Sequence, residues 1–108
     1  MDIAELLKAL GDPTRFGIYS LLLTRKHCVR SLAKKMGITE SAVSQHLKIL
    51  KTAGLVYGER FGHHMHYMPV QAAVDAIAEA FASMRGQALS LDRNAKTCHC
   101  EFKKQEAL

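Results

Sequence analysis

The chain has little or none of what several classes of protein require. It has no tryptophan, two prolines and three cysteines in 108 residues, and 48% of its residues are hydrophobic. That hydrophobic content excludes a disordered chain, and the scarcity of proline favours a globular, mostly helical protein. No run of about 18 apolar residues occurs, so the sequence predicts neither a membrane-spanning helix nor a membrane partner.

The first residues carry no pattern typical of secretion. Asp2 and Glu5 are acidic, and no basic segment followed by an apolar one is present, so we expect a cytoplasmic location. In a reducing compartment, three cysteines are more often ligands, sensors or plain thiols than a disulfide framework. A single domain of this length buries only a modest fraction of its surface, so a second copy would stabilise it.

The positive charge is concentrated in the middle third of the chain. The formal net charge is +5, and residues 25–60 carry eight Lys and Arg side chains against two Glu, which leaves +6 there. The flanking thirds are close to neutral. Such an asymmetry is typical of a protein that presents one face to a polyanion, although a solvated basic surface has the same composition.

Helical periodicity predicts four helices in the first half of the chain. Apolar residues recur at helical spacing in four segments, residues 3–10, 12–24, 28–36 and 39–53. Asp12 and Pro13 are typical of a helix start. The turn of residues 37–39, which contains a glycine, separates the last two helices and makes them a helix-turn-helix. Either Thr39 or Ser41 would cap the fourth helix.

A β-hairpin is predicted directly after the helix-turn-helix. Two β-type runs, residues 55–61 and 64–68, are joined by Gly62 and His63 and closed by Pro69. A hairpin in this position is a wing. We therefore expect a mainly α fold with a small β-hairpin, arranged as a winged helix-turn-helix.

A last helix begins near Val70 and carries a narrow apolar stripe. Its members alternate steps of four and three residues, as in a coiled coil: Val70, Val74, Ile77, Phe81, Met84 and Ala88. The stripe either closes the domain's own core or joins two copies, and we expect a homodimer through the terminal helices. Residues 1–89 would form the domain for recognition and dimerisation, and residues 90–108 a flexible tail that contains cysteines.

The fourth predicted helix has one apolar side and one polar side. Val43, Leu47 and Leu50 are spaced to pack inward, and the opposite side carries short polar and basic side chains. Glutamine pairs with adenine, and lysine pairs with guanine or phosphate. This side is therefore predicted to bind the major groove of double-stranded DNA, which is favoured over an ordinary solvent-exposed helix face. The candidate DNA-binding residues are Thr39, Ser41, Ser44, Gln45, His46, Lys48, Arg60 and His63.

Other side chains near this helix suggest backbone contacts. Phosphate contacts that set register without reading sequence are expected from Arg30, Lys34, Lys35 and Lys51. Arg60 and the wing histidines can reach the backbone or a minor groove. The histidines His63, His64 and His66 could instead bind a metal, but no cysteine or carboxylate lies beside them in the sequence, which favours DNA contact or simple exposure.

Three blocks of sequence resemble a known family. They are residues 10–15 before the second helix, residues 44–50 in the reading helix and residues 53–56 leading into the wing. Over about residues 4–85 the chain resembles the ArsR/SmtB family of winged-helix repressors. The resemblance implies a homodimer that binds its operator when empty and releases it when an inducer binds, usually a toxic metal or metalloid.

The cysteines are the candidate sensing residues. Family members that detect thiophilic ions often carry Cys-Val-Cys at the start of the first helix of the pair. Here Cys28 is present, but Arg30 stands where the second cysteine would be. The tail carries Cys98 and Cys100, which with Cys28 would supply three thiolates for arsenite, cadmium or lead, or for zinc with an added imidazole.

The cysteines and the predicted fold are also compatible with functions other than ion sensing. The tail cysteines could be plain thiols, or the thiols could oxidise, which would make the protein a redox or persulfide sensor of the same fold. A winged helix that binds only protein would show no salt-dependent affinity for DNA. An enzyme is not expected, because the sequence has no nucleophile–base constellation, phosphate-binding glycine loop or paired carboxylates. We predict a repressor released from DNA by a thiophilic ion.

Overall fold

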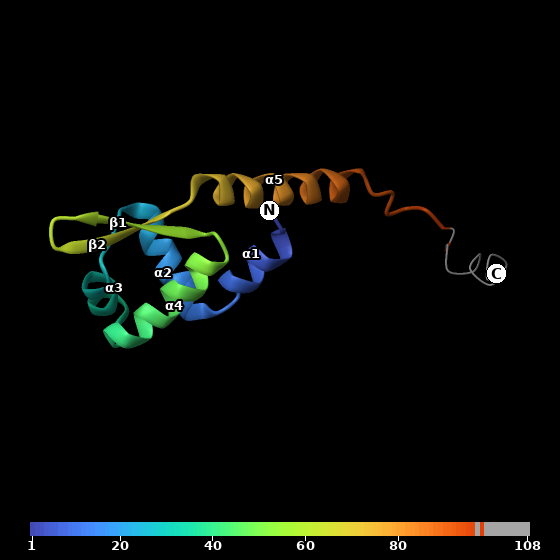
Figure 1. The fold of residues 1–108 in the computed structure, drawn as a ribbon. Helices are drawn as coiled ribbons and strands as arrows, with labels where there is room; N and C mark the ends of the chain where they lie inside the picture. The colour runs from blue at the N-terminus through green and yellow to red at the C-terminus, as the bar shows by residue number, and fades with distance from the viewer. Residues whose placement is uncertain (97, 99–108) are drawn as a thin grey trace, which may run out of the picture.

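The computed structural model describes residues 1–96 and residue 98. The elements follow one another along this part of the chain (Figure 1), in the order α1 (Ile3–Leu10), α2 (Pro13–Thr24), α3 (Val29–Met36), α4 (Glu40–Thr52), β1 (Val56–Phe61), β2 (His64–Pro69) and α5 (Gln71–Ser90). This order confirms the predicted mainly α fold with a small hairpin. The observed helix and strand ends lie close to those predicted from periodicity and turn residues.

Local capping explains where several helices begin and end. Asp2 caps α1, Asp12 caps α2 and Thr39 caps α4, each accepting a hydrogen bond of 3.0 Å from a backbone amide of the first turn. Pro13 occupies the first position of α2, where its missing N–H costs nothing. Gly37 ends α3 with a φ of 68°, a left-handed conformation that favours glycine.

The hydrophobic core lies where the first four helices meet the start of the hairpin and of α5. Val43, Leu47 and Leu50 of α4 are buried, as the helical period predicted. The buried apolar residues come from both halves of the domain: Leu6, Ala9, Ile18, Tyr19, Leu22, Leu32, Ala33, Val43, Leu47, Leu50, Leu55, Val56 and Ala73. Burying this apolar surface holds α3 and α4 in a fixed relative orientation.

The hairpin pairs β1 and β2 in antiparallel register. Phe61 lies opposite His64, and Gly62 in the turn between them has a φ of 64°. A further bridge joins His27 to Tyr67. The short link between α2 and α3 therefore runs beside the β2 edge of the hairpin.

Helix α5 packs on the domain along only part of its length. Ala73 is buried in the core, and Val74 and Ile77 pack partly against it, with α1 alongside. The rest of α5 extends beyond the domain (Figure 1), where Phe81 is 49% exposed and Met84 60% exposed. The predicted stripe therefore has two parts, one that closes the domain's own core and one that is uncovered. No helix of the described chain is both long and apolar enough to cross a membrane.

Candidate nucleic-acid interface

The outward side of α4 presents polar side chains to solvent. Because Val43, Leu47 and Leu50 are held in the core, the helical period directs the intervening positions outward. The exposed polar residues of this face, called the reading face below, are Ser41, Ser44, Gln45, Lys48 and Thr52. Their hydroxyl, amide and ammonium groups are of the kinds that hydrogen-bond to base edges in a major groove.

His46 differs from the other candidate readers on α4. Its ring is half-buried, and Nδ1 has no hydrogen-bond partner among the residues described. The imidazole lies close to the start of α2. The carboxyl group of Asp12, at the start of α2, has a lowered pKa. The main cause is the hydrogen bond that it accepts from the Arg15 amide, and the charge of His46 contributes to the same effect. A DNA contact from His46 stays a prediction.

Both helices of the helix-turn-helix carry exposed basic side chains. Arg30 lies in the first turn of α3, and Lys34 and Lys35 lie in its last turn. Lys51 lies in the last turn of α4. All four are exposed, so each can approach a phosphate without desolvating a buried group.

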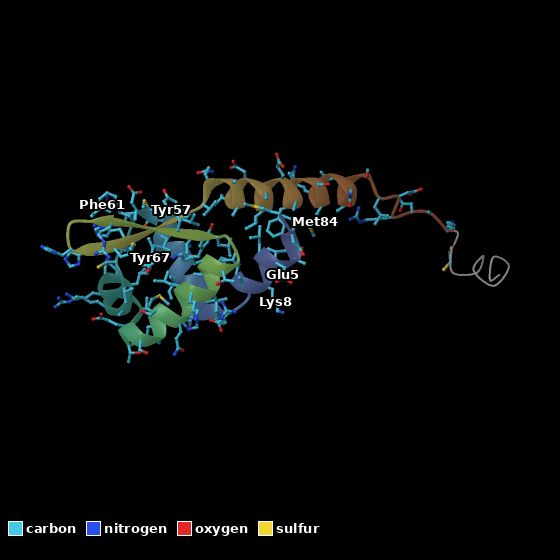
Figure 2. The ribbon with its side chains drawn as sticks, viewed as in Figure 1. Glu5, Lys8, Tyr57, Phe61, Tyr67 and Met84 are labelled. Atoms are coloured by element: carbon cyan, nitrogen blue, oxygen red, sulfur yellow. The ribbon has the colours of Figure 1, made fainter. Side chains whose placement is uncertain are left out.

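Three aromatic rings of the wing lie close together, those of Phe61, His64 and His66. Phe61 and His66 lie with ring centroids 5.2 Å apart, and His64 and His66 with centroids 6.4 Å apart. The register also places Glu59 opposite His66. A carboxylate therefore lies across the hairpin from a wing histidine, although none is adjacent to the histidines in the sequence. Arg60 near the end of β1 and His63 in the turn are both exposed. Figure 2 shows Phe61, Tyr57 and Tyr67 together in the wing, far from Met84 on α5.

Two contacts fasten the wing to the link between α2 and α3, and sequence reasoning missed both. The Tyr67 amide donates to the His27 carbonyl at 2.8 Å, and the His27 amide donates to the Tyr67 carbonyl at 3.3 Å. The Lys26 Nζ lies 3.7 Å from the centroid of the Phe61 ring. His27 is only 3% exposed, and this burial is the main reason that its pKa is lowered.

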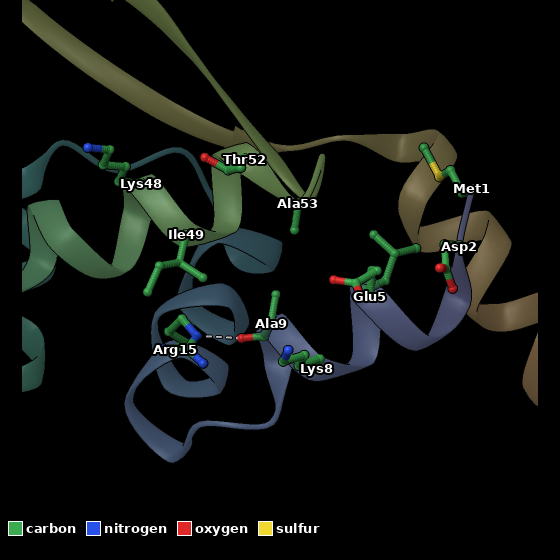
Figure 3. A pocket seen from close by; sticks show the side chains of 11 residues that line it. Met1, Asp2, Glu5, Lys8, Ala9, Arg15, Lys48, Ile49, Thr52 and Ala53 are labelled. Carbon is green, nitrogen blue, oxygen red and sulfur yellow. Dashed lines mark hydrogen bonds between the residues drawn. The ribbon is translucent and has the colours of Figure 1, made fainter.

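A groove of about 570 Å³ lies between α1 and the second half of α4 (Figure 3). Leu6 and Ile49 contribute apolar walls, and Lys48 connects the groove to the reading face. Arg15 Nε donates to the Ala9 carbonyl at 2.6 Å, which holds the start of α2 against the end of α1. The groove therefore adjoins the candidate DNA interface.

Of the three candidate sensing cysteines, the structure describes Cys28 and Cys98. Cys28 is a half-buried free thiol at the N-cap of α3 and makes no capping hydrogen bond there. Cys98 follows α5, which carries the chain away from α3 (Figure 1), and Cys100 lies outside the described residues. Within residues 1–96 and 98, no group of three His, Cys, Asp or Glu side chains is arranged to hold a metal ion.

Known proteins are similar to this chain in sequence. Residues 12–57 match the family described as bacterial regulatory protein, arsR family. The chain is 40% identical over 85 residues to the HTH-type transcriptional repressor SmtB of Mycobacterium tuberculosis, which covers 70% of this chain and 60% of the repressor. It is 32% identical over 84 residues to a putative arsenical resistance operon repressor of Halobacterium salinarum, which covers 76% of this chain and 70% of that protein.

A solved structure shows the same fold. It is a homodimeric winged helix-turn-helix DNA-binding domain from a possible ArsR-family transcriptional regulator of Mycobacterium bovis, 28% identical, with a TM-score of 0.62. The match covers 90% of this chain and 87% of that domain. The chain spans only 60% of the length of the M. tuberculosis repressor. These relatives are named as regulators and not as enzymes, in line with the sequence-based expectation. The chain belongs to the ArsR/SmtB family of winged helix-turn-helix transcriptional regulators.

Proposed function

We propose that this protein represses transcription by binding double-stranded operator DNA through α4 and the wing. The observation that carries the proposal is the reading face, whose Ser44, Gln45 and Lys48 are exposed on a helix held rigidly by its buried side. Arg30 and the wing residue Arg60 are exposed as candidate phosphate contacts. In this arrangement α4 reads base edges, and the surrounding cations fix its register on the duplex.

The unit that binds DNA in this proposal is a homodimer. Phe81 and Met84 expose apolar surface on the part of α5 that leaves the domain, and a second copy would cover it. The M. bovis neighbour is itself homodimeric. Two-fold symmetry would place the two α4 helices on half-sites about 34–36 Å apart, one turn of the double helix. The operator would then be a palindrome or close to one.

The inducer in this proposal is a thiophilic ion, namely arsenite, cadmium, lead or zinc, bound by Cys28 together with Cys98 and Cys100. Cys28 supports this role as a half-buried free thiol at the edge of the helix-turn-helix. Because α5 leads away from α3 in one chain (Figure 1), the ligands would come from two subunits. Binding would release DNA by favouring a dimer geometry in which the two α4 helices no longer match their half-sites.

The DNA-binding part is tested on a duplex selected from a random-sequence pool by the full-length protein. Its affinity should fall steeply as salt rises, with the logarithm of the association constant decreasing by about 0.9 per phosphate contact for each unit of log salt. An affinity for DNA that does not depend on salt would contradict the proposal and favour a protein-binding winged helix.

The inducer is tested by adding arsenite, cadmium, lead, zinc or nickel to this complex while thiolate absorption is followed. One ion should release the duplex with a matching thiolate signal, and the Cys28→Ser variant should lose that response. An equal response in the variant would remove Cys28 from the mechanism. Release by peroxide or polysulfide, with no ion effective, would favour the redox sensor instead.

A further inference from the structure

The link between α2 and α3 is joined to the wing by an isolated antiparallel bridge between His27 and Tyr67. His27 and Tyr67 exchange two backbone hydrogen bonds of 2.8 and 3.3 Å, the pattern of a hydrogen-bonded antiparallel pair. The His27 side chain is buried, and its Nδ1 lies 2.9 Å from the Ser31 Oγ on α3. One residue therefore holds β2 and α3 together.

A side-chain contact reinforces this attachment nearer the tip of the wing. The Lys26 Nζ lies 3.7 Å from the centroid of the Phe61 ring, within the distance at which an ammonium is attracted to an aromatic face. Lys26 itself is exposed and lies in the basic third of the chain. Its charge alone would make it one more candidate phosphate contact, but the geometry directs that charge to the last residue of β1.

We propose that Lys26 and His27 are positioning residues that hold the wing at the angle at which it meets DNA. Without them the hairpin keeps its packing against α2 and the core near Tyr67, but the end that carries Phe61 loses its contact with the rest of the domain, and a two-stranded ribbon has little stability of its own. The wing residues Arg60 and His63 would then lose their fixed relation to α4. Lys26 thus contributes to DNA binding through Phe61 and not through a phosphate.

The same attachment would couple inducer binding at Cys28 to the position of the wing. This part of the inference rests on the proposed function. Cys28 directly follows His27 and is the N-cap of α3. An ion that draws the Cys28 thiol toward new ligands would shift the backbone of the residue that pairs with Tyr67. The wing would then be displaced within the subunit that holds the ion, together with any change between subunits.

The positioning role is tested by comparing three variants of the full chain on the selected duplex. Lys26→Met should weaken binding about two- to fivefold, the effect of losing one exposed cation–π contact, and should leave the salt dependence unchanged. Lys26→Arg should restore affinity, since guanidinium also binds aromatic faces. The matched control Arg30→Met should lower the salt slope by about 1. A salt slope lowered equally by Lys26→Met would overturn the positioning role.

A fluorescence experiment tests the attachment without DNA. The chain has no tryptophan, so Phe61→Trp introduces a single indole at the aromatic end of the contact. Adding Lys26→Met to this variant should make the indole more accessible to acrylamide and lower its anisotropy. Unchanged quenching and anisotropy would show that Lys26 does not hold the wing and would overturn the proposal.

The coupling to Cys28 is tested with the same reporter and the ion that gives thiolate absorption. Indole emission should change over the same ion concentrations as thiolate absorption, and Cys28→Ser should abolish both changes. Thiolate absorption with unchanged indole emission would overturn the coupling while leaving ion binding in place. Absence of any thiolate absorption would refute the proposed inducer and the coupling together, and the positioning role would still be decided by the Lys26 variants.

Discussion

The Thr39 hydroxyl accepts a hydrogen bond from the Ala42 amide at 3.0 Å, and this bond begins α4. Two residues, Thr39 and Ser41, could have supplied the cap by sequence alone. The structure assigns it to Thr39, which has the extended backbone conformation of a cap residue. Ser41 is left exposed in the first turn of the helix, free to contact DNA.

Thr39→Ala should therefore destabilise the fold. The variant leaves the Ala42 amide without its acceptor, and we expect the free energy of unfolding to fall by about 1 kcal/mol. Urea denaturation measures this change. The matched control is Ser41→Ala, which should alter stability by less than about 0.5 kcal/mol. Equal losses for both variants would contradict the assignment of the cap.

Base reading and phosphate contact should separate by mutation. Gln45→Ala should weaken binding to the selected duplex by about 1–3 kcal/mol and reduce discrimination against random DNA. Arg30→Ala should weaken binding to both kinds of DNA alike and lower the salt slope by about 1. Fluorescence anisotropy titrations at several salt concentrations measure both effects. Identical behaviour of the two variants would argue against α4 as the reading helix.

The uncovered part of α5 should be required for dimerisation. Met84 is 60% exposed in the single chain, and a carboxylate there would be placed in an apolar interface in the dimer. Met84→Glu should therefore shift the protein toward monomer in sedimentation equilibrium, with a dissociation constant raised at least about tenfold. Ser83→Glu adds the same charge one residue away and should stay dimeric. A dimeric Met84→Glu variant would place the interface elsewhere.

Stability should depend on the protonation of His27. Burial is the main cause that lowers the pKa of His27, with the positive charges of Arg25 and Lys35 adding to it. His27 therefore binds a proton more readily in the unfolded chain than in the folded chain. The free energy of unfolding should then decrease as pH falls below about 6.5. Urea denaturation between about pH 8 and pH 5 should show a weaker pH dependence for His27→Gln. An unchanged dependence would mean that His27 contributes no such effect.

The Tyr19 hydroxyl should reduce stability. It is buried, its pKa is raised by that burial, and it has no hydrogen-bond partner in the part of the chain that the structure describes. Tyr19→Phe removes the unsatisfied group and should raise the free energy of unfolding by about 1 kcal/mol. The exposed Tyr57 offers a control, and Tyr57→Phe should change stability little. A clear loss in Tyr19→Phe would show that the hydroxyl is hydrogen-bonded in the folded protein.

Much of the candidate site follows from local signals. The turn at Gly37 and the period of Val43, Leu47 and Leu50 place the reading face on α4, because a helix with one buried side must expose the other. The wing follows from two β-type runs around Gly62, whose positive φ a hairpin turn requires. These features depend on residues close together in the chain, so their pattern is readable before the fold is known.

Only the tertiary structure determines which segments pack against one another. The stripe on α5 is continuous in sequence, yet Val74 packs on the core while Met84 is uncovered, because α5 continues past the end of the domain on which its first turns pack (Figure 1). The direction in which α5 leads the chain away from α3 is likewise a property of the fold (Figure 1).

The amino-acid sequence by itself determined the order of the elements, the family and the chemistry of the reading face, since each depends on local spacing and residue type. Only the tertiary structure decided that Lys26 lies on Phe61 and that His27 pairs with Tyr67. These contacts join segments far apart in the chain, and the pairing with Tyr67 uses backbone groups that every residue except proline carries. No side-chain pattern records such a contact, so only the packed fold reveals it.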